Sequence, residues 1–341
     1  MIRIDSIKIE GPANVLKDID KTRFCTKQSF DSAGVILSDK LNIEGKDINR
    51  SGLNSIQFDN RKQTLTVALS SKILAENYYE LININTIDQV FDTINKTGIV
   101  SIDKSKLDDF AIHTVDFTTN IKGSHKPNDY IQALKLMSLN SRYKVDTFKG
   151  AGSNKHKTGI VFTGRQTSFK ERCIMYDKHT EIVKDKNFIS GLKSPLQVIN
   201  QFSNVLRIEN NVCQHSKVRE YTLTDNTLIS VLNSQAVLPN YKLFQKIKNL
   251  SGVQTDLFSF DPDMKLLQLE KIYGQQTIIK ELCFDFGLIK EFISKHVKGN
   301  ISGYVRQYRQ IANDILNSQN QVTGQNENDI IFELENLLKV A

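Results

Sequence analysis

The chain has 341 residues, of which 39% are hydrophobic, and its formal net charge is +7. A chain of this length builds one large domain or two ordinary ones around a substantial buried core. The start, MIRIDSIKIEG, lacks the apolar block of a signal peptide, and no apolar run approaches the ~20 residues of a membrane span. We therefore expect a folded protein of the cytoplasm with no membrane contact.

The cysteines indicate a reducing compartment. The sequence has four of them, far apart and without a CxxC pair. This spacing is not that of a zinc site, and it favours free thiols over disulfides.

Positive charge is concentrated in one segment. Residues 122–186 hold 14 Lys and Arg against 6 Asp and Glu, a balance of +8, so the rest of the chain carries −1. This asymmetry predicts a polyanionic partner for the segment. The alternative is an ordinary solvated face.

Alternating apolar residues predict strands in the first two thirds of the chain. In chain order they are residues 1–11, with an irregularity near Ser6, then 55–58, 64–69, 111–121, 142–148, 159–163, 172–176 and 204–212. Helical spacing predicts helices at 86–96, 127–139 and around 195–202. In the first of these, Thr86 with Gln89 resembles a capping box, and Gly98 ends the helix. Strands with helices between them indicate an α+β domain with an antiparallel sheet.

Beyond about Tyr221 the apolar spacing becomes helical. Helices are predicted at 225–235, 263–273, 276–286, 288–297, 301–317 and 328–340. We place a domain boundary near residue 224, which gives an α+β domain at 1–224 and an α-helical domain at 225–341. Residues 276–295, with Gly287 at the turn, resemble a helix-turn-helix, although any two helices joined through a glycine share this pattern.

Two strands carry charged residues on their polar faces. In 111–121, Asp116 points away from Val115 and Phe117, and in 204–212, Arg207 and Glu209 share the face opposite Ile208. Together with Glu181, these carboxylates would suit Mg²⁺ or Mn²⁺. The alternative is that Arg207 and Glu209 form ion pairs across the sheet.

Tyrosines are the candidate nucleophiles. Tyr221 follows the strand of Arg207 after a basic run, and Tyr304 and Tyr308 are one helical turn apart. A phenol attacks at neutral pH only with help from a metal or nearby cations. The alternative for each of them is an aromatic ring half-buried against a sheet or helix.

Three segments taken in order resemble a known family. IHTVDFTTNI, then TGIVFTGRQTSFKERCIMYDKHTEI, then NVLRIENNV with a basic run and Tyr221, are similar to rolling-circle replication initiators. The group in question is the filamentous-phage gene II/gene X type, with plasmid Rep proteins of the replication initiation factor class more distant. The resemblance covers residues 100–225 and extends only loosely to the helical tail.

The resemblance implies a metal-dependent nickase and ligase that links itself through tyrosine to the 5′ phosphate of one DNA strand. It implies an HUH-endonuclease-like fold, a bacterial host, DNA as partner, and host helicase and polymerase as further partners. Asp116 matches the family's strand aspartate, Tyr176, Lys178 and Glu181 match its Tyr-x-Lys…Glu segment, and Arg207 and Glu209 match its Arg-x-Glu strand.

The predicted roles follow from that match. Asp116, Glu209 and Glu181 would hold Mg²⁺ or Mn²⁺, Tyr221 would attack the phosphate, and Lys178 and Arg207 would offset its charge. Tyr304 and Tyr308 are the rival nucleophiles. The cations expected to bind single-stranded or melted DNA are Lys155, Lys157, Arg165, Lys170 and Arg172.

The chain departs from this pattern in one respect. It lacks the His-hydrophobe-His metal motif of many such endonucleases, so carboxylates would have to supply most ligands. Two other functions stay open. One is a non-catalytic, sequence-specific DNA-binding regulator of replication, and the other is a metal nuclease that uses water.

Overall fold

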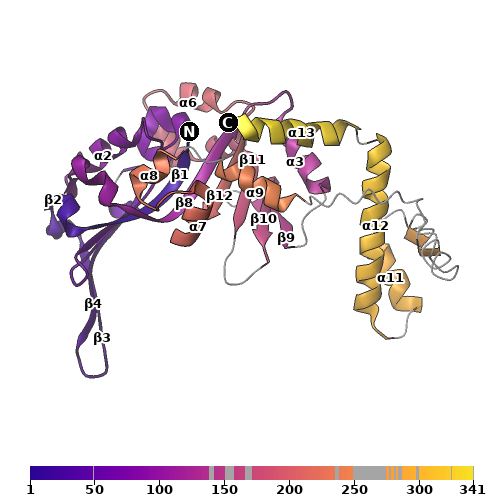
Figure 1. Cartoon of the computed structure of the whole chain (residues 1–341), viewed down its shortest axis with the longest axis horizontal. Helices are drawn as coiled ribbons and strands as arrows, with labels where there is room; N and C mark the ends of the chain where they lie inside the picture. Colours follow the sequence, from indigo (N-terminus) through magenta and orange to yellow (C-terminus); the bar gives the residue numbers. More distant parts are fainter. Residues whose placement is uncertain are drawn as a thin grey trace. The chain divides into compact units, whose positions relative to one another are not determined.

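The computed structural model describes most of the chain and shows an α+β protein with a helical C-terminal region (Figure 1). The described residues are 1–48, 50–137, 142–149, 157–165, 171–234, 238–248, 274–275, 278–279, 282, 286–296, 299–323 and 325–340. No helix among them is long and apolar enough to cross a membrane.

The central feature is a ten-stranded antiparallel sheet, in the order β3-β4-β5-β6-β1-β8-β12-β11-β10-β9. Its strands are β1 (Ile4–Pro12), β3 (Cys25–Phe30), β4 (Ile36–Glu44), β5 (Leu53–Asp59), β6 (Thr64–Ser70), β8 (Ala111–Ile121), β9 (Tyr143–Lys149), β10 (Lys157–Gly164), β11 (Arg172–Asp177) and β12 (Leu206–Val212). A separate pair is formed by β2 (Leu16–Ile19) and β7 (Val100–Ile102). The predicted strands are therefore confirmed, and the sheet places β8, β12 and β11 at neighbouring positions.

The irregularity predicted near Ser6 is a bulge in β1. Ile4 pairs with Phe117 of β8 and Ser6 pairs with Asp116, so Asp5 is the extra residue between two consecutive partners. A bulge breaks the alternation of side chains between the two faces of a strand. It leaves Asp5 free to turn toward the face on which Asp116 lies.

Helices lie on both faces of the sheet. Their bounds are α1 (Gly45–Ile48), α2 (Ile87–Asn95), α3 (Pro127–Leu136), α4 (Lys178–Ile182), α5 (Lys186–Ser190), α6 (Pro195–Gln201), α7 (His215–Thr222), α8 (Leu228–Leu232), α9 (Pro239–Ile247), α11 (Phe286–His296), α12 (Ile301–Thr323) and α13 (Gln325–Val340). Short 3-10 segments occupy Ala13–Val15, Lys21–Arg23, Ser71–Glu80 and Lys104–Asp109. Figure 1 shows α6 and α7 on opposite sides of the central strands.

The helix predicted at 86–96 forms, but not its capping box. Thr86 has a helical backbone and caps nothing with its side chain. Its hydroxyl instead donates to the carbonyl of Leu81 at 2.8 Å, because the chain that enters the helix is tightly turned. Gly98, with a φ of 69°, follows the helix end as predicted.

The β3–β4 hairpin has no counterpart in the sequence prediction. All six residues of β3 are exposed, so neither face is selected by burial and no apolar alternation marks the strand. Its tip carries the exposed side chains of Phe30, Val35 and Leu37. Figure 1 shows this hairpin extending beyond the other strands of the sheet.

The chain divides into two compact units. The first comprises Met1–Asn249 and Phe332–Ala341, and the second comprises Leu250–Ile331. The boundary that we predicted near residue 224 thus falls inside the first unit. The reason is that α9 packs on the sheet, where the Asn240 amide donates to Thr119 Oγ1 at 2.9 Å.

The second unit contains α11 and α12, which share a small apolar core. Its buried members include Ile289, Ile293, Tyr308 and Ala312. The helix predicted at 263–273 lies outside the described residues. Most of the first helix of the predicted helix-turn-helix also lies outside them, so that motif stays a prediction.

The last turns of α13 complete the first unit. The Glu333 carboxylate accepts the Ser124 backbone N–H at 2.7 Å and its hydroxyl at 3.0 Å. Glu335 Oε2 lies 2.9 Å from Lys248 Nζ, just after α9. Leu338, on the same turns, is fully buried. Residues from the very end of the chain therefore hold segments that lie more than 80 residues earlier.

We predict that Leu338→Ala destabilises the first unit by about 2–5 kcal/mol, because it removes buried methyl groups and leaves a cavity. The free energy of unfolding in urea measures the loss. Val340→Ala is the matched control, since this neighbouring side chain is 83% exposed. Equal stability of the two variants would show that the C-terminal turns do not support the sheet.

Candidate functional site

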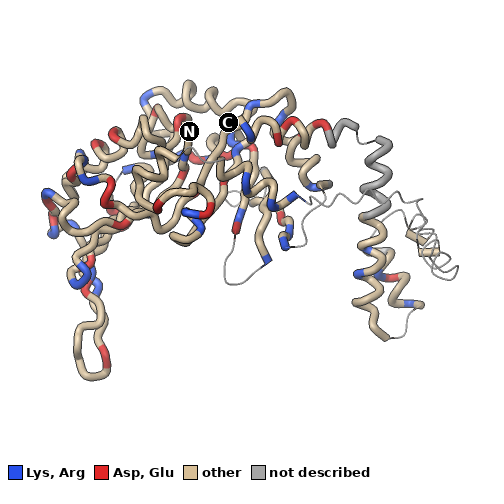
Figure 2. The backbone as a smooth tube through the Cα atoms, in the orientation of Figure 1, with Lys and Arg blue, Asp and Glu red and all other residues tan. Residues whose placement is uncertain are grey.

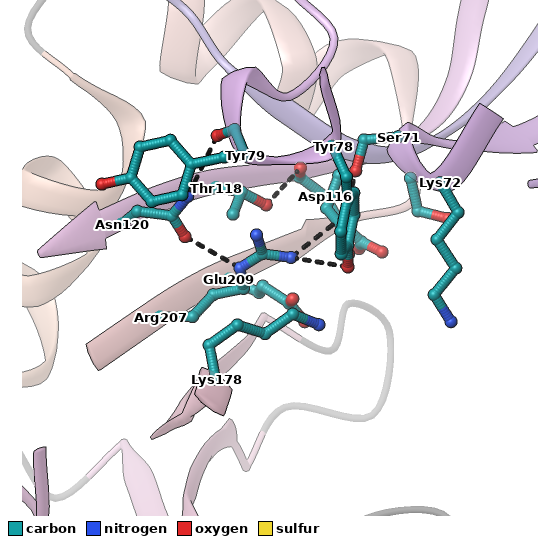
Figure 3. A network of polar contacts seen from close by, with 12 residues as sticks. Ser71, Lys72, Tyr78, Tyr79, Asp116, Thr118, Asn120, Lys178, Arg207 and Glu209 are labelled. Atoms are coloured by element: carbon teal, nitrogen blue, oxygen red, sulfur yellow. Dashed lines mark hydrogen bonds and ion pairs between the residues drawn. The ribbon is translucent and has the colours of Figure 1, made fainter. Parts of the chain in front are cut away.

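The polar face of the three neighbouring strands brings the predicted charged residues together. In β12, Arg207 pairs with Asn120 of β8, and Glu209 pairs with Thr118. Paired residues point to the same side of a sheet. Asp116, two residues from Thr118, therefore shares its face with Arg207 and Glu209. We call this group, together with Asp5, Tyr78, Asn120, Tyr176 and Lys178, the polar cluster (Figure 3).

Arg207 is the centre of the polar cluster and is fully buried. Its Nη1 lies 3.2 Å from Asp5 Oδ1 and donates to the Tyr78 hydroxyl at 3.0 Å, while Nε donates to Asn120 Oδ1 at 2.9 Å. The rings of Tyr78 and Phe202 lie 5.1 and 5.2 Å from its guanidinium carbon. Nη2 has no partner among the described residues. The guanidinium is thus held from three elements of the fold.

Asp5 is the acidic partner that the sequence analysis missed. The bulge in β1 turns it toward Arg207, and its carboxylate also accepts a hydrogen bond from the Ser71 hydroxyl. Burial raises the pKa of Asp5, but the charges of Arg207 and Lys178 outweigh it, and the net pKa lies below the ordinary value. Asp5 is therefore ionised and balances Arg207. The irregular spacing of β1 was the only signal in the sequence.

Lys178 and Glu209 are joined through Tyr176. The Tyr176 hydroxyl donates to Glu209 Oε1 at 2.6 Å, and Lys178 Nζ lies 3.4 Å from the same hydroxyl. Gly159 of β10 faces Tyr176, where an added Cβ would lie 2.5 Å from the Tyr176 Cβ. The added Cβ would lie even closer to the Met175 carbonyl oxygen, so glycine is needed for the close approach of β10 to the backbone of β11 at Tyr176.

Burial and crowding bring three titration points close to neutrality. Burial, and then the charge of Asp5, raise the pKa of Glu209 to about 7. Burial raises the pKa of Asp116 to about 6, with Asp5 adding to it and the Asn211 amide, 2.5 Å away, opposing it. Burial, and then Arg207, lower the pKa of Lys178 to about 8. The cluster therefore gains or loses protons in response to small changes in local charge.

Tyr221 lies on the other face of the sheet from Asp116. Its ring packs near Phe117, 6.5 Å between centroids, and Phe117 alternates with Asp116 along β8. Its hydroxyl is fully buried with the ring and donates to Glu171 Oε1 at 3.0 Å. Burial and Glu171 raise the pKa of Tyr221 well above its usual value. The structure thus does not bring the predicted nucleophile together with the predicted metal ligands.

Glu171 is the centre of this second network. It accepts the Tyr143 hydroxyl of β9, the Tyr221 hydroxyl of α7 and Lys246 Nζ of α9, the last at 3.1 Å. Hydrogen bonds and charge therefore hold the pKa of Glu171 below its usual value although burial raises it. Tyr221 thus has a structural role, because it ties α7 to the start of β11.

The other predicted residues are dispersed. Glu181 lies on α4, its Oε2 is buried without a partner among the described residues, and no hydrogen bond or ion pair there joins it to Asp116 or Glu209. Tyr304 is 41% exposed and Tyr308 is buried, both on α12 of the second unit.

The predicted DNA-binding cations are only partly described. Arg165 and Arg172 are exposed, whereas Lys155 and Lys170 and the side chain of Lys157 lie outside the described residues. Figure 2 shows other lysines and arginines along β9 to β11, which belong to the basic segment 122–186.

Comparison with known proteins gives little. No family model matches the chain, and no curated protein matches it. One solved structure, the rolling circle replication initiator protein from Geobacillus stearothermophilus, aligns with 64% of this chain and 77% of its own, at 11% identity and a TM-score of 0.32. A likeness this weak supports no statement about fold or activity.

The chemistry of the polar cluster follows from its own residues. Its carboxylates suit a hard divalent cation such as Mg²⁺, which commonly takes one or two protein carboxylates and completes its shell with water or phosphate. Among the described residues, no three His, Cys, Asp or Glu are arranged as a complete metal site. The raised pKa values of Asp116 and Glu209 indicate that their negative charge is not fully offset by the protein.

We predict that Asp116→Asn flattens the pH dependence of stability. The folded pKa of Asp116, about 6, exceeds its ordinary 3.8, so the stability linked to its proton is complete below pH ~4 and is lost as the pH rises through 6. The loss is about 3 kcal/mol. Urea unfolding from pH 4 to 8 in EDTA measures it.

The control for this prediction is Asp146→Asn, because the Asp146 side chain is 72% exposed. This variant should keep the wild-type decline. An unchanged decline in Asp116→Asn would show that burial does not perturb this carboxyl.

Proposed function

We propose that the chain is a rolling-circle replication initiator that nicks and rejoins one DNA strand through a 5′-phosphotyrosine. The observation that carries the proposal is the polar cluster, in which Asp116 and Glu209 lie on one sheet face beside the cations Arg207 and Lys178. Phosphodiester chemistry needs carboxylates and cations in one place. The motif order in the sequence supports the same function, and an HUH-endonuclease-like relationship of the sheet is part of the proposal.

In this proposal Mg²⁺ or Mn²⁺ binds to Asp116 and Glu209, with Asp5 as an additional acidic neighbour. The charge of Asp5 raises the pKa of Asp116 and of Glu209, so Asp5 repels each of these two carboxylates. A divalent cation would relieve that repulsion. When bound, it would polarise the scissile phosphate as a Lewis acid.

The two cations of the cluster have different roles. Arg207 is fully buried and engaged with Asp5, Asn120 and Tyr78, so it acts as a positioning residue. Lys178 is 4% exposed, and the one hydrogen bond of its ammonium among the described residues, to Tyr176, is long at 3.4 Å. Lys178 is therefore better placed to turn toward a phosphoryl oxygen.

The nucleophile proposed from the sequence is Tyr221, with Tyr304 and Tyr308 as its rivals, and the surroundings of the tyrosines bear on the choice. Tyr78 and Tyr176 are buried in the cluster, and burial raises the pKa of each. Tyr221 donates to Glu171 on the opposite face. Tyr304 is the one tyrosine among the described residues that is exposed. The phenol oxygen of the nucleophile would form the bond to phosphorus as the bond from phosphorus to the 3′ oxygen breaks, and the proton lost by the phenol would be balanced by protonation of that 3′ oxygen, which leaves as the 3′-OH.

We predict a covalent protein–DNA adduct that depends on a single tyrosine. Single-stranded oligonucleotides labelled at the 3′ end and tiled across the gene and its flanks, incubated with Mn²⁺, should give a labelled band on a denaturing protein gel. Of Tyr221→Phe, Tyr304→Phe and Tyr308→Phe, the variant that removes the nucleophile should abolish the adduct, because phenylalanine has no oxygen to attack. The other two should retain it, and mass spectrometry of the adduct names the residue.

The possible outcomes of this experiment identify either the nucleophile or a different function. An adduct lost only in Tyr221→Phe would place the nucleophile on α7. Cleavage without any adduct, in every tyrosine variant, would indicate a nuclease that uses water. Binding with neither cleavage nor adduct would indicate a non-catalytic regulator. The regulator has some structural support, because Asp5 already neutralises Arg207 within the cluster.

We further predict that Mn²⁺ raises the thermal unfolding midpoint by a few degrees, since a ligand that binds only the folded state stabilises it. Asp116→Asn and Glu209→Gln should each abolish the rise. Glu181→Gln should retain it, because Glu181 makes no contact with the other two carboxylates among the described residues. A rise that survives in Asp116→Asn would place the metal elsewhere.

A further inference from the structure

We propose that Tyr79 is a stacking platform for one base of single-stranded DNA, with Lys122 and Arg3 binding the adjacent phosphates. The inference rests on the proposed function only in taking DNA as the ligand, and it does not depend on strand cleavage. It concerns the surface next to the polar cluster, where the chain leaves the 3-10 segment Ser71–Glu80.

Tyr79 is half-buried, with a supported ring. The fully buried Phe202 packs against it at 5.3 Å between centroids, so this contact comes from the protein interior. The exposed Lys122 places Nζ 5.4 Å from the ring centroid. A base can replace the lysine over the ring while Lys122 moves to a phosphate, which is the pairing of aromatic and cation that single-strand binders use.

Arg3 supplies a second cation. Its Nε is buried without a hydrogen-bond partner among the described residues, and such a group is costly unless something satisfies it. Burial raises the pKa of Tyr79, and the charge of Arg3 opposes that rise. The acid that acts on Tyr79 is Glu80. With Lys122 included, cations outnumber acids around the ring, and this favours an anionic ligand.

Asn120 ties the platform to the polar cluster. Its amide donates to the Tyr79 carbonyl at 3.3 Å, and its carbonyl oxygen accepts from Arg207 Nε at 2.9 Å. Figure 3 shows Tyr79 beside Asn120 at the edge of the network, with its hydroxyl directed away from Arg207. A base stacked on Tyr79 would therefore sit at a fixed offset from Asp116 and Glu209.

The preference for a single strand follows from the geometry of stacking. A base must offer a free face to the ring, and the bases of a duplex already stack on one another. Tyr79 and its two neighbouring cations should thus bind DNA after the strands have separated. The phosphates next to the stacked base would then lie toward the polar cluster.

The test uses the absence of tryptophan from the sequence. Tyr79→Trp introduces a single tryptophan whose emission reports stacking directly. Titration with an oligothymidylate should quench this emission, and the same length of duplex should not. Binding of the oligothymidylate, measured by anisotropy of an end label, with unchanged tryptophan emission would overturn the proposal.

Affinity provides a second measurement. Tyr79→Leu should weaken single-strand binding by about 5- to 100-fold, whereas Tyr79→Phe keeps the ring and should stay within about twofold. Lys122→Gln should reduce the slope of log affinity against log salt by about 0.7. The matched control is Tyr241→Leu, because Tyr241 is also half-buried under a lysine, Lys339 at 5.6 Å, but lies on α9.

The outcomes separate this inference from the proposed function. Quenching and a Tyr79-dependent affinity without any nicking would support the platform and contradict the strand transferase. Nicking with wild-type affinity in Tyr79→Leu would contradict the platform alone. Failure of the wild-type protein to bind single-stranded DNA at low salt would overturn both.

Discussion

The buried guanidinium of Arg207 is the constraint on which the centre of this fold depends. A charge removed from water must be paired and hydrogen-bonded, and breaking such a pair usually costs several kcal/mol. Arg207 finds its partners on three separate elements, Asp5 of β1, Asn120 of β8 and Tyr78 of the 3-10 segment. The bulge at Asp5 is therefore part of the site, because a regular β1 would turn this carboxylate to the other face.

The opposite face of the sheet is fixed by a second carboxylate. Glu171 collects hydrogen bonds from Tyr143, Tyr221 and Lys246, which come from β9, α7 and α9. Because Tyr221 satisfies a buried acid there, freeing its hydroxyl for chemistry would leave Glu171 with one donor fewer. Tyr221 follows β12 in the sequence, as expected of the predicted nucleophile. It is nevertheless poorly placed to attack a phosphate at Asp116, because Asp116 lies on the opposite face of the sheet.

Much of the fold could be predicted from the sequence, because half-buried strands alternate. The same alternation correctly put Asp116, Arg207 and Glu209 on one face. Asp5 could not be assigned, since a bulge reverses parity by one residue, nor could Tyr78, which sits in a segment with the unusual backbone of Ala75 (φ 52°). The β3–β4 hairpin escaped prediction because burial selects no face of it.

The domain boundary shows a different limit of sequence reasoning. Helical spacing after Tyr221 predicted α8, α11, α12 and α13, but it missed α9 and does not reveal what the helices pack against. Asn240 of α9 reaches the backbone of Ile208, and Glu333 of α13 returns to Ser124. Both contacts join residues far apart in the chain, so no local pattern encodes them.

The charges of the polar cluster place the pKa values of three of its side chains near neutral pH. Asp116, Glu209 and Lys178 have pKa values of about 6, 7 and 8, so their protonation changes readily at neutral pH. A cation entering beside the two carboxyls would favour their ionised forms, and a phosphate near Lys178 would favour its charged form. In the proposed function a metal ion and a phosphate would therefore assist each other's binding, because each would offset the charge that the other brings.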